Sequence, residues 1–332
     1  MANVYLATAT PRGGEHYDYP SVRIREAYAR DSHGKHKLVE DPAQADLILF
    51  ATNYPYPPAG MGLYREELYK KYGKKVVLFN SNDYPSPFVG GLCASWHSGL
   101  EDIPGMGQGW CYYHPNSAEP SIEYMDWPEG GTKYLWSFKG SEITHPIRSE
   151  LFRLDDTDAL VVDTSKASLA NLRGETPEQE RQSFLNDYLE LLKQSAYIAC
   201  PRGRGASSMR IFEAMRAGRA PVIISDAWVP LPFIDWDKCS IRIAEKDIHT
   251  MPELLRKHRD TAEEMGKAAR AEWERVLGPD GLFHYVTEAA LLVQRANNGA
   301  SGMQKLRKSM RLLQPDNLRA VLRYYTPGRG GN

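Results

Sequence analysis

The segment from Tyr197 to Asp226 constrains the fold of this chain more than any other part. It contains an apolar run ending at Cys200, a Pro-Arg-Gly-Arg-Gly loop, an amphipathic stretch over 209–217 and a second apolar run over 220–226. This order predicts a βαβ unit, in which a helix joins two parallel strands. The glycine-rich, positively charged loop follows the first strand. Backbone N–H groups of such a loop, with the N-terminus of the next helix, can bind a diphosphate.

Composition limits the classes of protein to consider. The 332 residues suffice for two domains, and 42% hydrophobic residues with 25% charged residues are typical of a soluble globular protein. The net charge of −1 gives no reason to expect nucleic acid or an anionic membrane as a partner. No apolar run approaches the roughly 20 residues of a spanning helix, and the first residues do not resemble a signal peptide. We therefore expect a cytoplasmic protein with no transmembrane segment. The sequence leaves the oligomeric state open.

The four cysteines are scattered along the chain rather than grouped. They are Cys93, Cys111, Cys200 and Cys239. Reduced, mostly buried thiols are the expected state of such cysteines in a cytosolic protein.

Two runs of alternating strands and helices indicate an α/β chain with two domains. Apolar strands are predicted at 4–9, 46–51 and 75–79, and then at 133–138, 159–163, 197–200, 220–226 and 240–243. Helices are predicted at 21–29, 62–72, 144–154, 176–194, 209–217, 252–259, 262–277 and 282–296. Continuous apolar strands separated by helices predict parallel sheets covered on both faces. We therefore expect two Rossmann-like parallel-sheet domains facing a central cleft.

The segment 80–132 interrupts this alternation. It is rich in Pro, Gly, Trp and Tyr, and it is predicted to be mostly loop with short strands. A long irregular segment inside a compact protein is usually functional. We place the domain boundary at its end, which gives an N-terminal domain over 1–132, a C-terminal domain over 133–300, and C-terminal helices over 301–332 that can pack back on the first domain.

The βαβ motif supplies candidate anion ligands. Ser207 or Ser208 is a good N-cap for the helix, and Gly218 suits its C-terminal end. Arg210 lies in the first turn, where its planar guanidinium can hold phosphate oxygens bidentately. Glu213, on the same helix face, can accept two hydroxyl donors, which suits a ribose. The alternative is an Arg210–Glu213 ion pair on a solvated face.

Other candidates lie beside the motif. The loop contains Arg202, Gly203 and Arg204. Its two arginines either neutralise a diphosphate or are solvent-exposed side chains of a turn. Lys139 ends the first strand of the same domain, and ligands of parallel sheets bind outside the carboxyl ends of strands. Asp226 and Trp228 follow the next strand and are expected there too, with burial in the core as the alternative for Trp228.

The same residues allow a rival interpretation. Gly203, Gly205 and Ser208, with Asp226 ending the next strand, approximate a dinucleotide fingerprint, which would indicate an NAD(P)-dependent oxidoreductase. Serine in place of the third glycine removes the usual support for close helix–strand packing. Two arginines in the loop favour neutralisation of phosphate by side chains.

Residues 200–218 and 220–236, in this order, resemble the exostosin-like glycosyltransferase family, as do 243–248, 251–255 and 134–140. The resemblance covers about 133–260 and implies a GT-B fold with the nucleotide-sugar donor on the C-terminal domain and the acceptor on the N-terminal one. It implies inverting transfer from a nucleoside-diphosphate sugar, most simply a UDP-sugar, to a hydroxyl of a glycan or glycoconjugate. Arg210 would hold the diphosphate and Glu213 the ribose.

The resemblance extends to further residues and has one departure. Arg202, Gly203 and Lys139 would line the phosphate pocket, and Asp226 would lie near the donor sugar. The family often has Asn-Gly-Trp or Asp-Gly-Tyr where this chain has Asp-Ala-Trp at 226–228, which leaves the donor sugar open. We expect a stand-alone enzyme of polysaccharide biosynthesis, without the membrane anchor and second catalytic domain of animal exostosins.

Inverting transfer needs a general base for the acceptor hydroxyl. The candidates follow predicted N-terminal strands: Asp83, His16 and Asp18, with Glu15 beside them. Each of these can instead be a turn residue.

No metal or other cofactor is expected, because arginines and a helix dipole can stabilise the leaving diphosphate. Asp156-Thr-Asp158 precedes a strand and is interpreted as a polar turn. His33 and His36 lie in a polar loop without a third ligand nearby in the sequence, so we interpret them as solvated histidines.

Two further hypotheses concern the acceptor and catalysis. Seven aromatic residues over 96–134 can line a glycan groove or fill a loop-rich core: Trp96, Trp110, Tyr112, Tyr113, Tyr124, Trp127 and Tyr134. The chain can also be a non-catalytic nucleotide-sugar-binding partner of another glycosyltransferase. Hydrolysis of the donor by the purified protein alone would separate an enzyme from such a partner.

Overall fold

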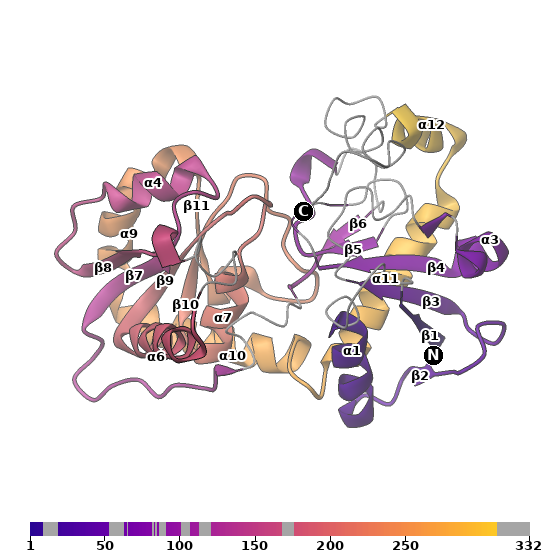
Figure 1. Ribbon diagram of the computed structural model, residues 1–332, viewed down its shortest axis with the longest axis horizontal. Helices are drawn as coiled ribbons and strands as arrows, with labels where there is room; N and C mark the ends of the chain where they lie inside the picture. Colours follow the sequence, from indigo (N-terminus) through magenta and orange to yellow (C-terminus); the bar gives the residue numbers. More distant parts are fainter. Residues whose placement is uncertain are drawn as a thin grey trace. The chain divides into compact units, whose positions relative to one another are not determined.

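The computed structural model describes residues 1–8, 19–52, 63–64, 66–81, 83, 85, 91–100, 107–112, 121–167 and 176–310. The chain forms two compact units, each considered by itself (Figure 1). The first unit comprises Met1–Pro115, Ala227–Phe233 and Gly278–Asn332, and the second comprises Asn116–Asp226 and Ile234–Leu277.

The first unit is built on a parallel sheet with the strand order β2-β1-β3-β4-β5-β6. Its strands are β1 (Asn3–Ala7), β2 (Lys37–Leu38), β3 (Leu47–Thr52), β4 (Val76–Asn80), β5 (Gly91–Cys93) and β6 (Gly107–Gly109). Its helices are α1 (Tyr19–Arg30), α3 (Glu67–Tyr72), η2 (Gly73–Lys75), η3 (Ser98–Leu100), α11 (Leu282–Gly299) and α12 (Gly302–Met310). Helix α11 packs along β3 to β6 and against α1. A helix from the C-terminal part of the chain therefore completes the core of the N-terminal sheet.

The second unit is built on a parallel sheet with the order β11-β10-β9-β7-β8. Its strands are β7 (Tyr134–Gly140), β8 (Ala159–Asp163), β9 (Ser195–Pro201), β10 (Ala220–Ile224) and β11 (Ile241–Ile243). Its helices are α4 (Pro146–Phe152), α6 (Glu178–Gln194), α7 (Met209–Ala217), α8 (Trp236–Cys239), η5 (Glu245–Thr250), α9 (Met251–Lys257), η6 (Arg259–Thr261) and α10 (Ala262–Val276). Helices α6, α7 and α10 cover one face of the sheet, and α4 and α9 cover the other (Figure 1).

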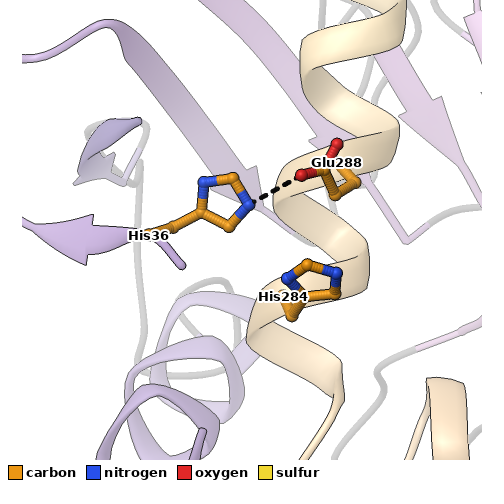
Figure 2. Close-up of side chains that lie close together, drawn as sticks. All are labelled: His36, His284 and Glu288. Atoms are coloured by element: carbon orange, nitrogen blue, oxygen red, sulfur yellow. Dashed lines mark hydrogen bonds and ion pairs between the residues drawn. The ribbon is translucent and has the colours of Figure 1, made fainter. Parts of the chain in front are cut away.

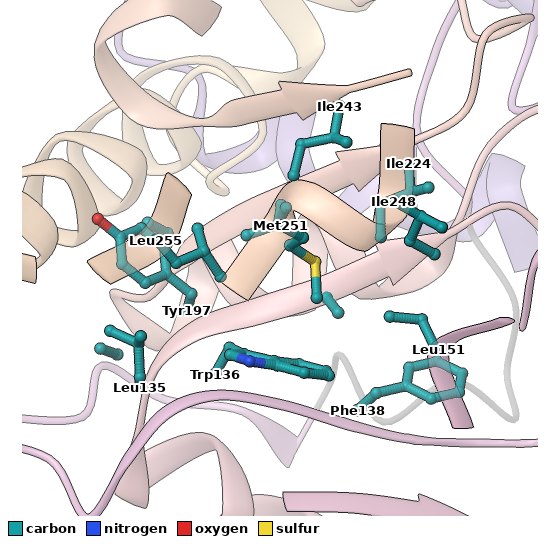
Figure 3. Close-up of a cluster of buried hydrophobic side chains, with 14 of the residues drawn as sticks. Leu135, Trp136, Phe138, Leu151, Tyr197, Ile224, Ile243, Ile248, Met251 and Leu255 are labelled. Carbon is teal, nitrogen blue, oxygen red and sulfur yellow. The ribbon is translucent and has the colours of Figure 1, made fainter. Parts of the chain in front are cut away.

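The core of the second unit shows why its strands are apolar throughout. Trp136 and Phe138 of β7 are fully buried and pack in one cluster with Leu151 of α4 and with Met251 and Leu255 of α9 (Figure 3). Burial of each such side chain stabilises the fold by roughly 1.5–3 kcal/mol. Because helices cover both faces, no position of β9 or β10 is left for a solvated side chain, and every residue of both strands is buried.

The strand order of the second sheet fixes where a ligand can bind. Numbered along the chain, its strands run 5-4-3-1-2, so the order reverses between β7 and β9. In doubly wound sheets the ligand crevice opens at this reversal, outside the carboxyl ends of the strands. Lys139 lies at that end of β7, and Arg202 directly follows β9.

The predicted fold class, α/β with two Rossmann-like parallel-sheet domains of GT-B type, is confirmed by the two sheets. Helix α7 spans the predicted residues, and Gly218 ends it in the left-handed conformation with φ 76°. Helix α6 begins at Glu178 rather than at 176, because its N-cap, Pro177, is extended with ψ 150°. The central cleft depends on the placement of the units and stays a prediction.

The two compact units do not coincide with the predicted domains, which were continuous segments over 1–132, 133–300 and 301–332. Helix α11 and the short segment Ala227–Phe233 both belong to the first unit. A bridge between His97 and Trp228 holds this segment, and Gly109 allows its close approach. A Cβ at Gly109 would lie 2.1 Å from the carbonyl oxygen of Val229.

Two predictions from composition can be set beside the structure. All four cysteines are free and buried, as predicted. Among the described residues, no helix is both long and apolar enough to cross a bilayer.

Candidate functional site

Arg210 joins the start of α7 to the end of β7. Its Nε and Nη2 atoms donate hydrogen bonds of 3.1 and 2.7 Å to the carbonyl oxygen of Lys139. Gly140 makes room for it, because a Cβ there would lie 2.6 Å from Nη2 of Arg210. The guanidinium carbon lies 5.0 Å from the centre of the Phe138 ring. The side chain of Arg210, which is predicted to bind phosphate, is therefore fixed at the carboxyl edge of the sheet. It lies beside Lys139, the other predicted phosphate-binding residue at this edge.

Glu213 is buried, with 5% of its surface exposed, and its Oε2 atom accepts a 2.7 Å hydrogen bond from the hydroxyl of Tyr188 on α6. Burial, followed by the charge of Glu213, raises the pKa of Tyr188 well above its ordinary value. The solvated face of the alternative interpretation is ruled out, since the carboxylate lies inside the unit. A ribose role for Glu213 stays a prediction.

The ammonium group of Lys139 is directed toward α6. It donates a 3.1 Å hydrogen bond to the carbonyl oxygen of Phe184, lies 4.1 Å from the centre of that residue's ring, and is 3.8 Å from a carboxylate oxygen of Asp187. Burial lowers the pKa of Lys139, and Asp187 opposes this shift. Lys139 thus contributes positive charge beside Arg210, with its position set by α6.

Arg148 on α4 is a buried cation that the sequence analysis missed. Its Nε and Nη2 atoms donate to the carbonyl oxygens of Arg202 and Pro201, and its Nη1 atom donates to that of Ser141. These bonds tie the ends of β7 and β9 together at the reversal of strand order. A signal was present, because Arg148 lies on the same helix face as the buried Leu151, where an apolar residue is expected.

The loop after β9 is electropositive and partly buried. The side chain of Arg202 is 17% exposed, and its Nη1 atom lies 3.8 Å from a carboxylate oxygen of Glu245. Burial lowers the pKa of the nearby His145, and the positive charges of Arg202 and Arg148 lower it further. The Gly203 backbone is buried close to Arg148, whereas Arg204 is exposed. The alternative of a decorated exposed turn therefore fits Arg204 but not Arg202.

Three polar atoms between the end of β9 and the start of α7 are buried without a hydrogen-bond partner among the described residues: Oγ of Ser207, Oγ of Ser208 and Nε of Arg202. Ser208 occupies the predicted N-cap position, with φ −138° and ψ 135°, yet its side chain makes no capping bond. Both serines are less than 5% exposed. Buried polar groups without partners cost free energy, so the two serine hydroxyls at the N-terminus of α7 and the Arg202 Nε atom in the preceding loop are candidate donors to an anionic ligand.

Asp226 lies at the carboxyl end of β10 as predicted, and it is held in place by Glu245. The Asp226 N–H donates to Oε1 of Glu245 at 3.1 Å, and Oδ1 of Asp226 accepts from the Glu245 N–H at 3.0 Å. The reciprocal pair fixes an exposed carboxylate at the ligand edge of the sheet.

Trp228 does not join this group. It is 3% exposed and belongs to the first unit, where it bridges to His97. Its predicted donor role has no support from the second unit, and burial in the core, the stated alternative, describes its position.

The predicted aromatic groove is only partly represented among the described residues. Trp96 and Trp110 are buried in the first unit, with 2% and 0% exposure, so they fill a core rather than offer a face to a sugar. Tyr124 and Trp127 pack in the second unit, beside Gly218 and Gly266 respectively. Tyr113 lies outside the described residues.

Asp83 is the one predicted base that the structure describes, and it lies at the carboxyl edge of the first sheet. Its Oδ1 atom accepts a 3.0 Å hydrogen bond from the hydroxyl of Tyr112, which also bonds to Ser95. Asp83 closely follows β4, Ser95 follows β5 and Tyr112 follows β6. These are neighbouring parallel strands that end at the same level. Burial, followed by the charge of Asp83, raises the pKa of Tyr112. His16, Asp18 and Glu15 lie outside the described residues.

Asp156 and Asp158 form the predicted polar turn. Asp156 accepts a 2.7 Å hydrogen bond from the indole of Trp136 and forms an ion pair with Arg256. Asp158 pairs with Arg256 and with Arg259. Their carboxylates therefore bind arginines of α9 and η6 and stabilise the turn.

Most of this site lies within a segment that is similar to one known family. Residues 110–258 match the family model of the Exostosin GT47 domain. The match contains the end of β7, the loop after β9 and helix α7. The resemblance identified from the sequence is therefore confirmed over this segment.

Curated relatives give the same picture over part of their length. An exostosin-1 homolog of Caenorhabditis elegans is 35% identical over 163 residues, which cover 45% of this chain and 42% of the relative. Exostosin-1 of Drosophila melanogaster is 34% identical over 158 residues, covering 44% of this chain and 21% of the relative. A probable glycosyltransferase of Arabidopsis thaliana is 41% identical over 81 residues, covering 24% and 16%. The chain thus spans less than half the length of these relatives.

Among solved structures, a glycosyltransferase from Rickettsia africae ESF-5 aligns with 94% of this chain and 98% of its own, at 11% identity and a TM-score of 0.39.

Proposed function

We propose that this protein is a glycosyltransferase that moves a sugar from a nucleoside-diphosphate sugar to a hydroxyl group of a glycan or glycoconjugate, since residues 110–258 match the family model of the Exostosin GT47 domain. The observation that carries the proposal is the set of unpartnered buried atoms of Ser207, Ser208 and Arg202 in the segment between β9 and α7. A diphosphate bound at this loop and helix N-terminus would supply acceptors for such donors. The reversal of strand order between β7 and β9 puts the same place at the ligand edge of the sheet.

The charge distribution supports departure of a diphosphate. Arg148, Arg202, Arg210 and Lys139 all lie at this edge, with buried or partly buried side chains. Cations in a partly desolvated site stabilise developing negative charge more strongly than cations in water. The proposed reaction is a single displacement that inverts the anomeric carbon, with UDP as the leaving group and without a required metal ion.

The donor class can be tested by thermal stabilisation of the purified protein with UDP, GDP, CMP, ADP and NADH, each with and without Mg²⁺. A ligand at about 100 times its Kd adds roughly 2.7 kcal/mol, which raises the melting temperature by a few degrees. We expect UDP to stabilise most, to a similar extent with and without Mg²⁺. Stabilisation by NADH alone would favour the oxidoreductase, and stabilisation by UDP without donor hydrolysis or transfer would favour a non-catalytic partner.

We propose Asp83 as the general base. Asp83→Asn keeps the side-chain shape and the hydrogen bond from Tyr112, but it removes the group that accepts a proton. We expect transfer to fall by at least about 100-fold, the usual effect of losing a general base, while stabilisation by UDP is unchanged. The matched control is Asp155→Asn, a carboxylate in the turn before β8. Wild-type transfer by Asp83→Asn would leave His16, Asp18 and Glu15 as the candidates.

A further inference from the structure

The first unit contains a cluster of ligand-forming side chains away from the second unit's sheet. His36 lies just before β2, and His284 and Glu288 lie on α11 (Figure 2). One nitrogen or oxygen from each residue lies within 4.8 Å of the corresponding atoms of the other two. The Nε2 atom of His36 is 3.0 Å from Oε1 of Glu288. Two histidines and one carboxylate form a common ligand set for Zn²⁺.

The sequence separates these residues, but the fold brings them together. His284 and Glu288 are four apart on α11, so they share one face of the helix. The loop carrying His36 is tied to the start of the same helix, because Ser32 donates to the carbonyl oxygen of Asp280 and Arg30 pairs with its side chain. The interpretation of His36 as a solvated histidine was wrong, since it is 2% exposed and its partners are about 250 residues away.

The imidazoles have nitrogen atoms that the described residues leave without partners. The Nδ1 atoms of both His36 and His284 are buried and make no hydrogen bond among those residues. A buried imidazole nitrogen without a hydrogen-bond partner is costly in a purely structural network. The Nε2 atom of His36 faces Glu288, and the Nδ1 atom of His284 is available as a ligand atom.

We propose that His36, His284 and Glu288 bind one transition-metal ion, Zn²⁺ by the chemistry of its ligands, and that this ion fastens the β2 loop to α11. In a tetrahedral zinc site with bonds of about 2.1 Å the ligand atoms are about 3.4 Å apart, so the three ligand atoms, which lie within 4.8 Å of one another, would move closer by at most about 1.4 Å. The fourth ligand is water or His33, whose ring stacks on His284 with 4.0 Å between centres. The proposal is independent of the glycosyltransferase function, and the ion has no part in transfer.

Lys35 distinguishes a metal site from a purely structural ion-pair network. Its ammonium group lies 2.6 Å from Oε1 of Glu288 and would compete with a metal for that oxygen. Half of its side chain is exposed, so it can turn away into solvent. In a metal site, Lys35→Met removes a competitor and leaves binding equal or tighter. In a structural network, the same change only removes an ion pair, and it gives no metal binding that could be measured.

The test uses the full chain without a histidine tag, stripped with a chelator and titrated with Zn²⁺ by calorimetry. We expect one ion per chain with a Kd near or below about 1 μM. Glu288→Gln and His284→Gln should each weaken binding at least tenfold, Lys35→Met should not weaken it, and the exposed His249→Gln serves as the control. Zinc should also raise the melting temperature of the wild type by a few degrees, but not that of the variant that carries both Glu288→Gln and His284→Gln.

Two results would overturn the site. One is the absence of stoichiometric zinc binding by the wild type. The other is binding that persists unchanged in the Glu288→Gln and His284→Gln double variant. Titration of the wild type with Co²⁺ provides a check that needs no variant, because tetrahedral nitrogen and oxygen ligation gives much stronger visible absorption than the hydrated ion. A spectrum identical to that of free Co²⁺ would count against the proposal.

Discussion

Arg210→Ala is expected to lower kcat/KM for sugar transfer by about 10³-fold and to abolish stabilisation by UDP. Charge-assisted hydrogen bonds contribute roughly 1.5–3 kcal/mol each, and a guanidinium can make two to a diphosphate. The effect should appear in both binding and rate, because negative charge on the diphosphate grows as the glycosidic bond breaks. Steady-state kinetics with the nucleotide sugar that the wild type uses best measures the loss of kcat/KM. A thermal-shift titration with UDP measures the loss of binding.

Two variants separate loss of the ligand contact from loss of local structure. Arg210→Lys keeps a positive charge without the planar fork, so we expect an intermediate loss of activity. Arg216→Ala removes another arginine from the same helix, one whose guanidinium lies over Trp273, and should keep transfer near the wild-type rate. Stabilisation of Arg210→Ala by UDP to the wild-type extent would rule out the assigned role.

The part of the site that depends on near neighbours could be predicted from the sequence. The bounds of α7 and the left-handed Gly218 follow from residues only a few positions away. Lys139, Arg202 and Arg210 could be grouped because parallel strands present their carboxyl ends at one edge of a sheet. None of these inferences needed side-chain packing.

The supporting contacts could not be predicted, because their partners are distant in the chain. Arg148 bonds to a carbonyl 54 residues away, and Tyr188 bonds to Glu213 across 25 residues. The choice between the two interpretations of Trp228 could not be made from the sequence for a related reason. The chain joins the first unit at Ala227, directly after a strand of the second, and neither periodicity nor composition marks that change.

Arg219 is the residue of the second unit whose loss should cost the most stability. Its side chain is 0% exposed, and it lies between Gly218 and β10. It donates hydrogen bonds to six carbonyl oxygens, those of Leu192, Lys193, Ala217, Gly218, Met125 and Asp126. Four of these belong to the C-terminal ends of α6 and α7, where carbonyl groups lack partners within their helices. The cation also complements the negative ends of both helix dipoles.

We expect Arg219→Met to lower the free energy of unfolding by about 3–5 kcal/mol. Methionine fills a similar volume but leaves the carbonyl groups buried without donors. Burial lowers the pKa of Arg219 to about 10, so the side chain is still charged at neutral pH, and the carbonyl groups offset the cost of burying that charge. Urea unfolding followed by circular dichroism measures the change, with the exposed Arg242→Met as a control expected to stay within about 0.5 kcal/mol. An equally small effect of Arg219→Met would mean that the two helix ends and the 125–126 segment are held mainly by apolar packing, including the Trp127 ring 4.9 Å from the guanidinium carbon.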